Sequence, residues 1–315
     1  MNSYDIVVIG GGMVGAATAI GFAKQGKRVA VIEGQEPAEF DASQPLDIRV
    51  SAISQTSVDL LTDLGAWQHT ASMRVCPYKR LETWEHLECR TRFDAQSLDL
   101  PQLGYIVENR LIQLGLWEEF SSYDNLTLLC PEKLDAIDFS ECSNKIILKS
   151  GTILSAEWVI GADGANSMVR NQAGIGITAW DYRQDCMLIN VETERSQQDI
   201  TWQQFTPTGP VAMLPLKGKQ ASLVWYHTKD EIKRLSGLSN EQLTSEVMAF
   251  FPSKLGQVEV INKAAFPLAR QHANQYVKHN VVLLGDAAHT INPLAGQGVN
   301  LGFKDVDALQ MVLAE

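Results

Sequence analysis

The chain has 315 residues, of which 45% are hydrophobic and 20% charged, and its formal net charge is −11. This length can bury a sizeable core in one large or two modest domains. The acidic balance argues against nucleic acid as a partner and against a general attraction to anionic lipid. No apolar run approaches the roughly 18–20 residues that a membrane span needs.

The cysteines and histidines suggest neither a disulfide framework nor a metal site. The cysteines are Cys76, Cys89, Cys130, Cys142 and Cys186. Their odd number and wide spacing fit reduced thiols in a cytosol, and packing is favoured over a catalytic thiol. The histidines show no metal-ligand spacing, so we expect no metal. The N-terminus enters a predicted strand almost at once, which leaves no room for a signal peptide.

The first predicted unit is a strand, a glycine turn and a helix. Residues 5–9 form a β-branched apolar run, which predicts a buried parallel strand. Gly10 then permits a tight turn, Gly12 lets the backbone approach a pyrophosphate, and Gly15 lets the helix pack on the strand. Free N–H groups at the start of that helix favour phosphate. The unit therefore predicts a bound dinucleotide.

A second apolar strand, residues 28–32, ends at Glu33. An acid about 20 residues after such a turn can accept hydrogen bonds from an adenosine ribose. The negative charge of Glu33 disfavours a 2′-phosphate on the ribose, so we expect the tightly held nucleotide to be FAD or NAD rather than NADP. The alternative is a surface acid that merely ends a strand.

Helical spacing of apolar residues and runs of strand formers predict the elements of the middle of the chain. The predicted helices cover residues 54–66, 108–121 and 240–251. The predicted strands lie within residues 81–93, 126–130, 145–160 and 186–226. This pattern predicts an α/β nucleotide-binding unit that is interrupted by a mainly antiparallel sheet.

Two later motifs place acids at predicted strand ends, where open α/β sheets bind ligands. Asp163 and Gly164 follow one strand, although an Asp-Gly turn before a capped helix explains them equally well. Asp286 follows the strand 281–284, and residues 293–300 open a helix through a glycine-rich turn that offers N–H groups to an anion. That helix continues to the end of the sequence without a stop signal, which we interpret as a chain cut inside a helix.

The nucleotide signals lie at opposite ends of the chain, so the nucleotide-binding domain must be discontinuous. We predict that it comprises residues 1–75, 104–180 and 270–315. The substrate domain is predicted to comprise residues 76–103 and 181–269.

The glycine turn and the two later motifs, in this order and spacing, resemble the group A flavin-dependent aromatic hydroxylases, the p-hydroxybenzoate hydroxylase superfamily. The resemblance covers the whole chain. It implies an α/β fold in which a discontinuous Rossmann-like FAD-binding domain carries an inserted, mainly antiparallel β-sheet substrate domain. It also implies FAD, tightly but non-covalently bound, with NAD(P)H and O2 as transient co-substrates.

The resemblance assigns roles to the motif residues. In the family the first turn holds the ADP pyrophosphate, and the middle motif helps hold FAD and forms part of the NAD(P)H path. The last motif places its Asp on the ribitol or ribose and its helix start near the flavin pyrimidine. The FAD-binding residues implied here are Gly10, Gly12, Met13, Val14, Gly15, Glu33, Arg49, Asn109, Asp163, Gly164, Arg170, Asp286, Pro293, Gly296, Gly298, Val299 and Asn300. Asn109 stands where many relatives carry arginine.

A narrower resemblance is to the ubiquinone-biosynthesis branch, in residues 49–54, 104–109 and 289–302. It implies hydroxylation of the ring of a prenylated benzoquinol. Alternatives are a sister hydroxylase acting on another ring carbon, a flavin reductase that hydrogenates isoprenoid chains, and a non-catalytic flavin-binding scaffold. The branch also implies association with other ubiquinone-biosynthesis proteins and peripheral contact with the inner membrane, which we expect from a region beyond residue 315.

The family's chemistry belongs mostly to its cofactor. NAD(P)H reduces the flavin, which captures O2 as a C4a-hydroperoxide and passes one oxygen to an electron-rich ring carbon. The helix that begins near residues 296–300 should favour negative charge on reduced flavin. The hydroperoxide must be kept from water, and we expect a dry pocket for it at Met213, Leu214, Pro215 and Trp225. Alternatively, these residues form the core of the sheet and do not contact the substrate. No catalytic base is identifiable.

Overall fold

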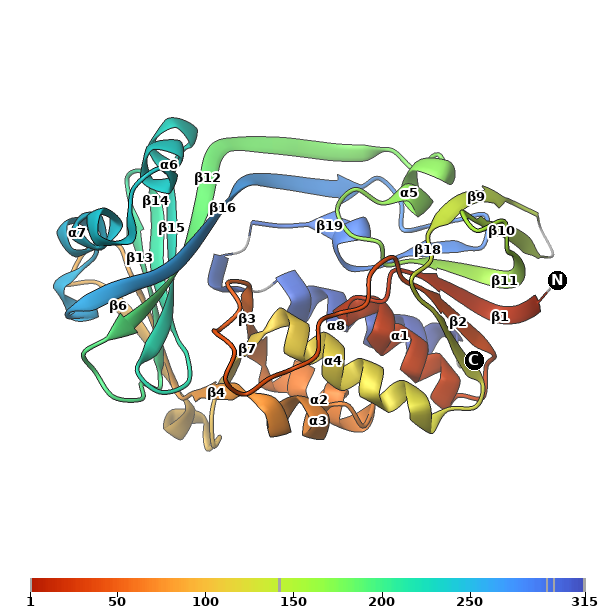
Figure 1. The fold of residues 1–315 in the computed structure, drawn as a ribbon, viewed down its shortest axis with the longest axis horizontal. Coiled ribbons are helices and arrows are strands. Elements are labelled where there is room, and N and C mark those ends of the chain that lie inside the picture. Colours follow the sequence, from red (N-terminus) through yellow and green to blue (C-terminus); the bar gives the residue numbers. More distant parts are fainter. Residues whose placement is uncertain (1, 141–142, 293, 297, 314–315) are drawn as a thin grey trace.

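The structure, a computed structural model, describes residues 2–140, 143–292, 294–296 and 298–313. Its first sheet runs in the order β17-β18-β11-β1-β2-β8, with β10 and β9 paired beside β11 (Figure 1). The strands β18, β11, β1, β2 and β8 are mutually parallel where they pair. The strands are β1 (Asn2–Ile9), β2 (Val29–Ile32), β8 (Leu126–Leu129), β9 (Leu134–Asp138), β10 (Asn144–Leu148), β11 (Ile153–Gly161), β17 (Val277–Lys278) and β18 (Val281–Leu283).

Both faces of the first sheet are covered, because its strands alternate between two cores. Ile6 and Val8 of β1 face the larger layer of helices, whereas Val7 and Ile9 face the β9–β10 pair and a short helix. The larger layer contains α1 (Met13–Lys24), α2 (Gln55–Asp63), α3 (Trp67–Met73), α4 (Asn109–Glu119) and α8 (Gly298–Leu313). The short helix is α5 (Met168–Gln172). Continuous apolar runs form the central strands β2 and β18 and the second half of β1, as the sequence predicts.

The second sheet runs in the order β19-β16-β12-β15-β14-β13-β5-β6. Neighbouring strands are antiparallel except for β13 and β5, which are parallel. Its strands are β5 (Arg80–Trp84), β6 (Arg90–Asp94), β12 (Ile177–Thr193), β13 (Ile200–Thr206), β14 (Gly209–Pro215), β15 (Gln220–Thr228), β16 (Val258–Ala273) and β19 (His289–Thr290). The helices α6 (Lys229–Ser236) and α7 (Asn240–Phe250) cover one face.

Smaller elements join these layers. A third sheet of order β3-β7-β4 consists of β3 (Val50–Ser54), β7 (Gly104–Glu108) and β4 (Val75–Tyr78). The single turns of 3-10 helix are η1 (Ala95–Leu98), η2 (Phe120–Ser122), η3 (Ser253–Leu255), η4 (Gly285–Ala287) and η5 (Leu294–Gly296). The predicted mixed α/β fold class is confirmed, with a mainly antiparallel sheet inserted between parts of the parallel one.

The predicted domain boundaries fall inside strands in three places. The boundary after residue 75 lies in β4, the one after residue 180 in β12, and the one after residue 269 in β16. The strands β12 and β16 pair along nearly their whole length and run from one part of the molecule to the other (Figure 1). A paired ribbon satisfies its own backbone hydrogen bonds, so it can bridge two units without the break in pattern that would mark a boundary.

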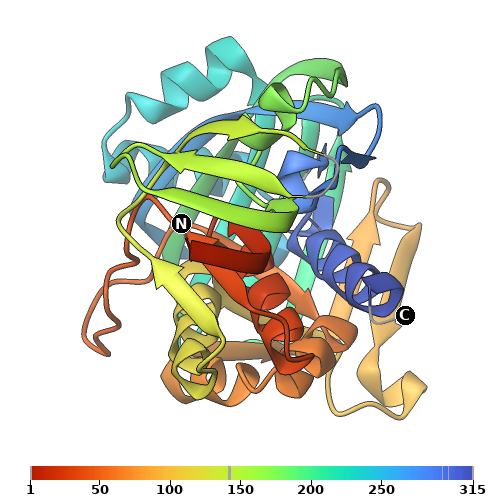
Figure 2. The same ribbon diagram turned by 90° about the vertical axis from the view of Figure 1, so that its right-hand side faces the viewer.

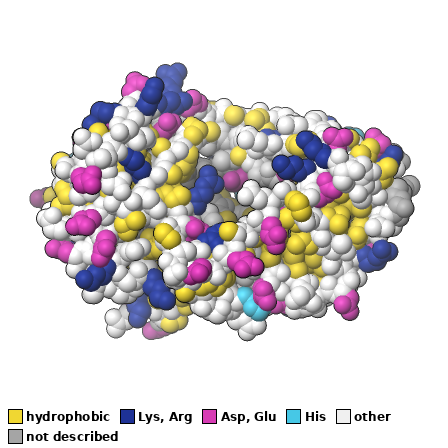
Figure 3. Space-filling model, in the orientation of Figure 1, with side chains coloured by type: hydrophobic (Ala, Val, Ile, Leu, Met, Phe, Trp, Pro, Cys, Tyr) yellow, Lys and Arg dark blue, Asp and Glu magenta, His cyan; other side chains and the backbone are white. Residues whose placement is uncertain are grey.

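The described residues include no helix that is both long and apolar enough to cross a membrane. Figure 3 shows a hollow between the part that contains the second sheet and the rest of the molecule.

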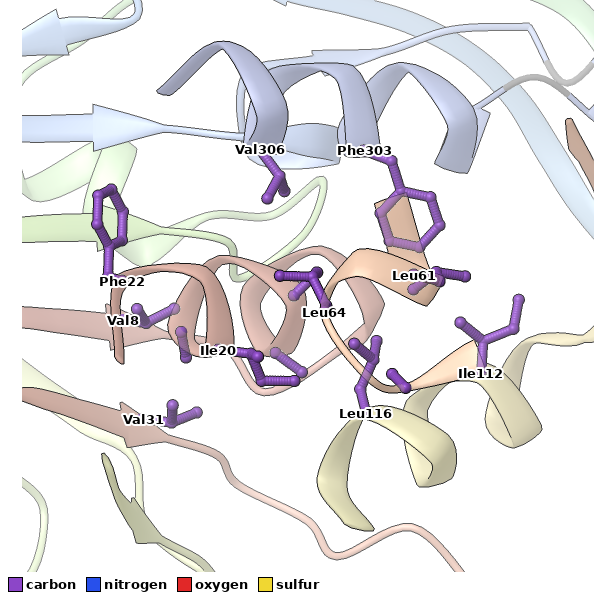
Figure 4. Packing of buried hydrophobic residues seen from close by; sticks show 14 of the residues in the cluster. Val8, Ile20, Phe22, Val31, Leu61, Leu64, Ile112, Leu116, Phe303 and Val306 are labelled. Carbon is purple, nitrogen blue, oxygen red and sulfur yellow. The ribbon is translucent and has the colours of Figure 1, made fainter. Parts of the chain in front are cut away.

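We predict that α8 depends on Phe303 for its attachment. Phe303 is 1% exposed and points with Val306 towards the helices beneath (Figure 4). Phe303→Ala should lower the free energy of unfolding by about 3–5 kcal/mol because it leaves a cavity in that core. Met311 of the same helix is 67% exposed, so Met311→Ala should change it by no more than about 0.5 kcal/mol. Urea denaturation checks both, and equal losses would contradict the assignment.

Candidate active site

A cavity of about 970 Å3 separates the glycine turn after β1 and the start of α8 from the uncovered face of the second sheet. Small-molecule sites usually measure about 300–1,000 Å3, so this one can hold a large ligand or two. The predicted residues that the structure brings together on its wall are Gly12, Met13, Val14, Arg49, Asn109, Gly164, Leu214, Asp286, Gly296, Gly298 and Val299. Pro293 lies outside the described residues.

The glycine turn brings the start of α1 to the cavity. A Cβ on Gly10, where φ is +102°, would lie 2.4 Å from the carbonyl oxygen of Ala162, and one on Gly15 would lie 1.9 Å from that of Gly10. Both positions therefore need glycine for packing. A Cβ on Gly12 would meet nothing within 4 Å. No side chain caps α1, so its first N–H groups remain available to an anion.

Glu33 lies beside this turn rather than on the cavity wall. Its Oε2 accepts a hydrogen bond of 2.7 Å from the N–H of Gly11, and its Oε1 accepts one of 3.1 Å from Gln35. The carbonyl oxygen of Gly11 accepts bonds from Trp117 Nε1 and Gln113 Nε2 of α4, at 2.7 and 2.9 Å. Sequence reasoning assigned neither of these two residues to the site.

The middle motif joins loops together. Asp163 Oδ2 accepts from the N–H groups of Met168 and Val169, at 2.7 and 3.2 Å, at the start of α5. The buried guanidinium of Arg170 donates to the carbonyl oxygens of Ala287 and Ala165, both at 2.8 Å. Of the predicted residues in this motif, only Gly164 lines the cavity.

Asp286 presents its carboxylate to the cavity from η4. Burial by the surrounding protein raises its pKa, although Asp286 remains exposed on the cavity side. Arg49 also lines the cavity, and its guanidinium lies 5.9 Å from the ring centroid of Phe266 on β16. Asn109 Oδ1 accepts a 2.7 Å bond from Ser51 Oγ, which fixes its orientation.

Asn300 and Asp305 hold α8 in place. Asn300 lies off the cavity wall: its Nδ2 donates to Ala52 O at 2.7 Å, and its Oδ1 accepts from Ser57 Oγ at 2.8 Å. Asp305 Oδ2 accepts from the N–H of Gly285 at 2.9 Å and contacts His289 Nε2 at 2.6 Å. Asp305 therefore ties α8 to both ends of the turn that carries Asp286, a role the sequence did not suggest.

The second sheet corrects the predicted substrate pocket. Successive strand residues face opposite sides. Leu214 lines the cavity, but Met213 and Trp225 lie in the core beneath α6 and α7. Pro215 pairs with Ala221 of that core and does not line the cavity. The cavity wall contains the residues of the other parity instead: Leu81, Leu188, Ala212, Val224 and Tyr226.

Tyr226 is the polar group of most interest on this wall. It is 1% exposed, and its hydroxyl has no hydrogen-bond partner within the described part of the chain. Burial raises its pKa, so the phenol stays neutral. Cys186 lies opposite on β12, and burial raises the pKa of its thiol as well. Both side chains are therefore neutral and buried beside the cavity.

The described cysteines Cys76, Cys89, Cys130 and Cys186 are free thiols, and Cys142 lies outside the described residues. In the described ranges, no group of three or more His, Cys, Asp or Glu side chains could hold a metal ion. The uncapped start of α1, the space beside Gly12 and the Asp286 carboxylate fit a dinucleotide with sugar hydroxyls, such as FAD.

Comparison with known proteins agrees with this geometry. The FAD binding domain family matches residues 3–315. The 3-demethoxyubiquinol 3-hydroxylase of Escherichia coli is 52% identical over 98% of this chain and 79% of its own length. A mitochondrial ubiquinone biosynthesis monooxygenase, COQ6, of Xenopus tropicalis is 33% identical over 99% of this chain and 78% of its own length. The crystal structure of pqsL, a probable FAD-dependent monooxygenase from Pseudomonas aeruginosa, matches with a TM-score of 0.84 at 21% identity, covering 99% of this chain and 86% of that one, and it supports the fold.

The contact between His289 and Asp305 predicts a pH-dependent stability. The hydrogen bond to Asp305 raises the pKa of His289, with Asp286 adding to the effect. A raised pKa means that the stabilisation is complete below the ordinary histidine pKa of about 6.5 and is lost as the pH rises through the raised value. Asp305→Asn should therefore lower the free energy of unfolding by about 1.5–3 kcal/mol at pH ~6 and by less above the raised pKa.

Denaturation of the wild type and the Asp305→Asn variant across the pH range measures this difference. In a His289→Gln background, the same substitution should have an effect that does not vary with pH. If the effect of Asp305→Asn stays constant with pH while His289 is present, the pairing is contradicted.

Proposed function

Because the chain belongs to the FAD binding domain family and is a flavin-dependent monooxygenase, we propose that it hydroxylates the ring of a prenylated benzoquinol in ubiquinone biosynthesis. NAD(P)H and O2 serve as co-substrates. The substrate class follows that of the E. coli relative, whose name states a 3-hydroxylase of demethoxyubiquinol. One observation carries the proposal: a single cavity joins the residues that fit FAD to the uncovered face of the second sheet.

The two sides of the cavity differ, and this difference supports a reaction on an apolar ring. FAD, when bound, would accept two electrons from NAD(P)H and activate O2. The starts of α1 and α8 favour negative charge on the bound cofactor. Leu188, Ala212 and Val224 give the opposite wall an apolar surface that excludes water from the reacting atoms.

We propose two kinds of role for the predicted FAD-binding residues. Those on the cavity wall contact the cofactor: Gly12, Met13, Val14, Arg49, Asn109, Gly164, Asp286, Gly296, Gly298 and Val299. Those behind the wall shape the loops that hold it: Gly10, Gly15, Asp163, Arg170 and Asn300. Glu33 orients Gly11 through its hydrogen bond, and its proposed second role is to accept a bond from a ribose hydroxyl.

We further propose that the protein contacts the membrane and other enzymes of the pathway, since a prenylated substrate dissolves in lipid. Flotation with vesicles that contain a prenylated benzoquinone tests the membrane contact. Recovery of all the protein at the bottom of the gradient would contradict it.

Asp286 should govern retention of FAD. A hydrogen bond to a charged group contributes about 1.5–3 kcal/mol, so Asp286→Ala should raise the Kd for FAD by roughly ten- to a hundredfold. Asp307 is exposed on α8 and does not line the cavity, so Asp307→Ala should leave the Kd unchanged. Flavin fluorescence titration of the two apoproteins measures this. Equal affinity in both variants would remove Asp286 from the site.

The reaction is tested with FAD-loaded protein, NAD(P)H and a demethoxybenzoquinol under isotopically labelled O2. We expect the quinol to stimulate NAD(P)H oxidation and the product to gain one labelled oxygen on its ring, as shown by mass spectrometry. Labelling at another ring carbon would indicate a sister hydroxylase. Oxidation of NAD(P)H that the quinol does not stimulate would contradict the proposed function.

A further inference from the structure

We propose that the outer edge of the second sheet binds the polyprenyl tail of the substrate. The proposal rests on the proposed function, because it requires a ring that carries such a tail. The binding surface is a row of side chains that crosses the strands from the cavity to the edge strand β6. We call this row, formed by Leu214, Thr201, Leu81 and Phe93, the tail row.

The strand register makes the tail row continuous. Leu81 of β5 lies opposite Thr201 of β13 on one side and opposite Phe93 of β6 on the other. Opposite residues in paired strands share a face of the sheet. Trp202 pairs with Met213 of the opposite face, so Thr201, Leu81 and Phe93 lie on the cavity face with Leu214. Three strand spacings of about 4.8 Å put Phe93 about 14 Å from Leu214.

By strand alternation the charged side chains of β5 and β6 point to the opposite face, although Glu82 also borders the cavity. Glu82 is buried there, with its carboxylate 2.8 Å from Arg90 Nη1 and 3.5 Å from Arg92 Nε, and it also binds Lys254. Thr201 adds no unmet polar group to the tail row, because its hydroxyl donates to Met213 O at 2.9 Å. The alternation of the strands thus leaves an apolar track on the cavity side.

Phe93 is the one apolar residue of the edge strand β6, whose other residues are Arg90, Thr91, Arg92 and Asp94, and it is 50% exposed. Leu98 and Leu100 follow in the sequence, at 57% and 40% exposure. Figure 2 shows this part of the chain, in tan, at the margin of the molecule. A tail that leaves the cavity here would cover Phe93 and reach the surface.

The test compares two ligands and three variants. The ligands share a demethoxybenzoquinone ring and carry either a methyl group or a four-isoprene tail. Phe93→Thr removes the aromatic ring but keeps a strand-forming residue, and Phe93→Leu keeps an apolar side chain. Ile153→Thr is the matched control, because Ile153 is a 37% exposed apolar residue at the start of β11 in the other large sheet.

The Kd of each ligand for each FAD-loaded protein is measured by fluorescence quenching. We expect Phe93→Thr to weaken binding of the tailed ligand about tenfold and to leave the methyl ligand unchanged. Phe93→Leu should restore most of the difference, and Ile153→Thr should bind both ligands as the wild type does. Unchanged binding of the tailed ligand to Phe93→Thr, or equal weakening of both ligands, would overturn the proposal.

This measurement needs no turnover, so it separates two failures. If the quinol is not hydroxylated but the affinity depends on the tail through Phe93, the proposed function fails and the tail row stands. If the quinol is hydroxylated and Phe93→Thr binds both ligands normally, the proposed function stands and the tail row fails.

Discussion

The close approach of three chain segments at one sheet edge is the constraint on which the site depends. The strands β1, β11 and β18 are neighbours and parallel, so their carboxyl ends meet. Gly10 lies against the backbone of Ala162 after β11, and Gly15 lies against Gly10. Val14 fits against Gly285 and Gly302, neither of which could carry a side chain without crowding it. Small residues at these contacts bring two helix starts to the same cavity.

Behind the cavity wall, buried or half-buried polar side chains link these segments. Arg170 joins the loop after β11 to η4, Asp305 joins η4 to α8, and Asn300 joins α8 to β3 and α2. Three of these bonds end on backbone groups, those of Ala287, Gly285 and Ala52. The predicted cofactor residues thus divide into those that line the cavity and those that hold the lining residues in place.

The second sheet gives the cavity an apolar wall, because successive residues of its strands face opposite sides. One face packs Met213, Trp202 and Trp225 under α6 and α7, and the other presents Leu214, Val224 and Tyr226 to the cavity. A shift of one residue in strand pairing would exchange the two faces, so the register decides which side chains form the cavity wall. The same alternation places the ion pairs of Glu82 away from the apolar track that ends at Phe93.

The sequence by itself determined the fold class, the cofactor and the family, because these depend on local patterns. Glycine spacing, buried strand runs and acids at strand ends are each readable within about 20 residues. It could not assign Met213 and Leu214 to opposite faces, since both are apolar in a buried strand and only the packing of α6 and α7 decides between them. The sequence also could not show that Asp305 binds the N–H of Gly285, or that β12 and β16 pair across the predicted domain boundaries. These residues are far apart in the sequence, so only the folded chain brings them into contact.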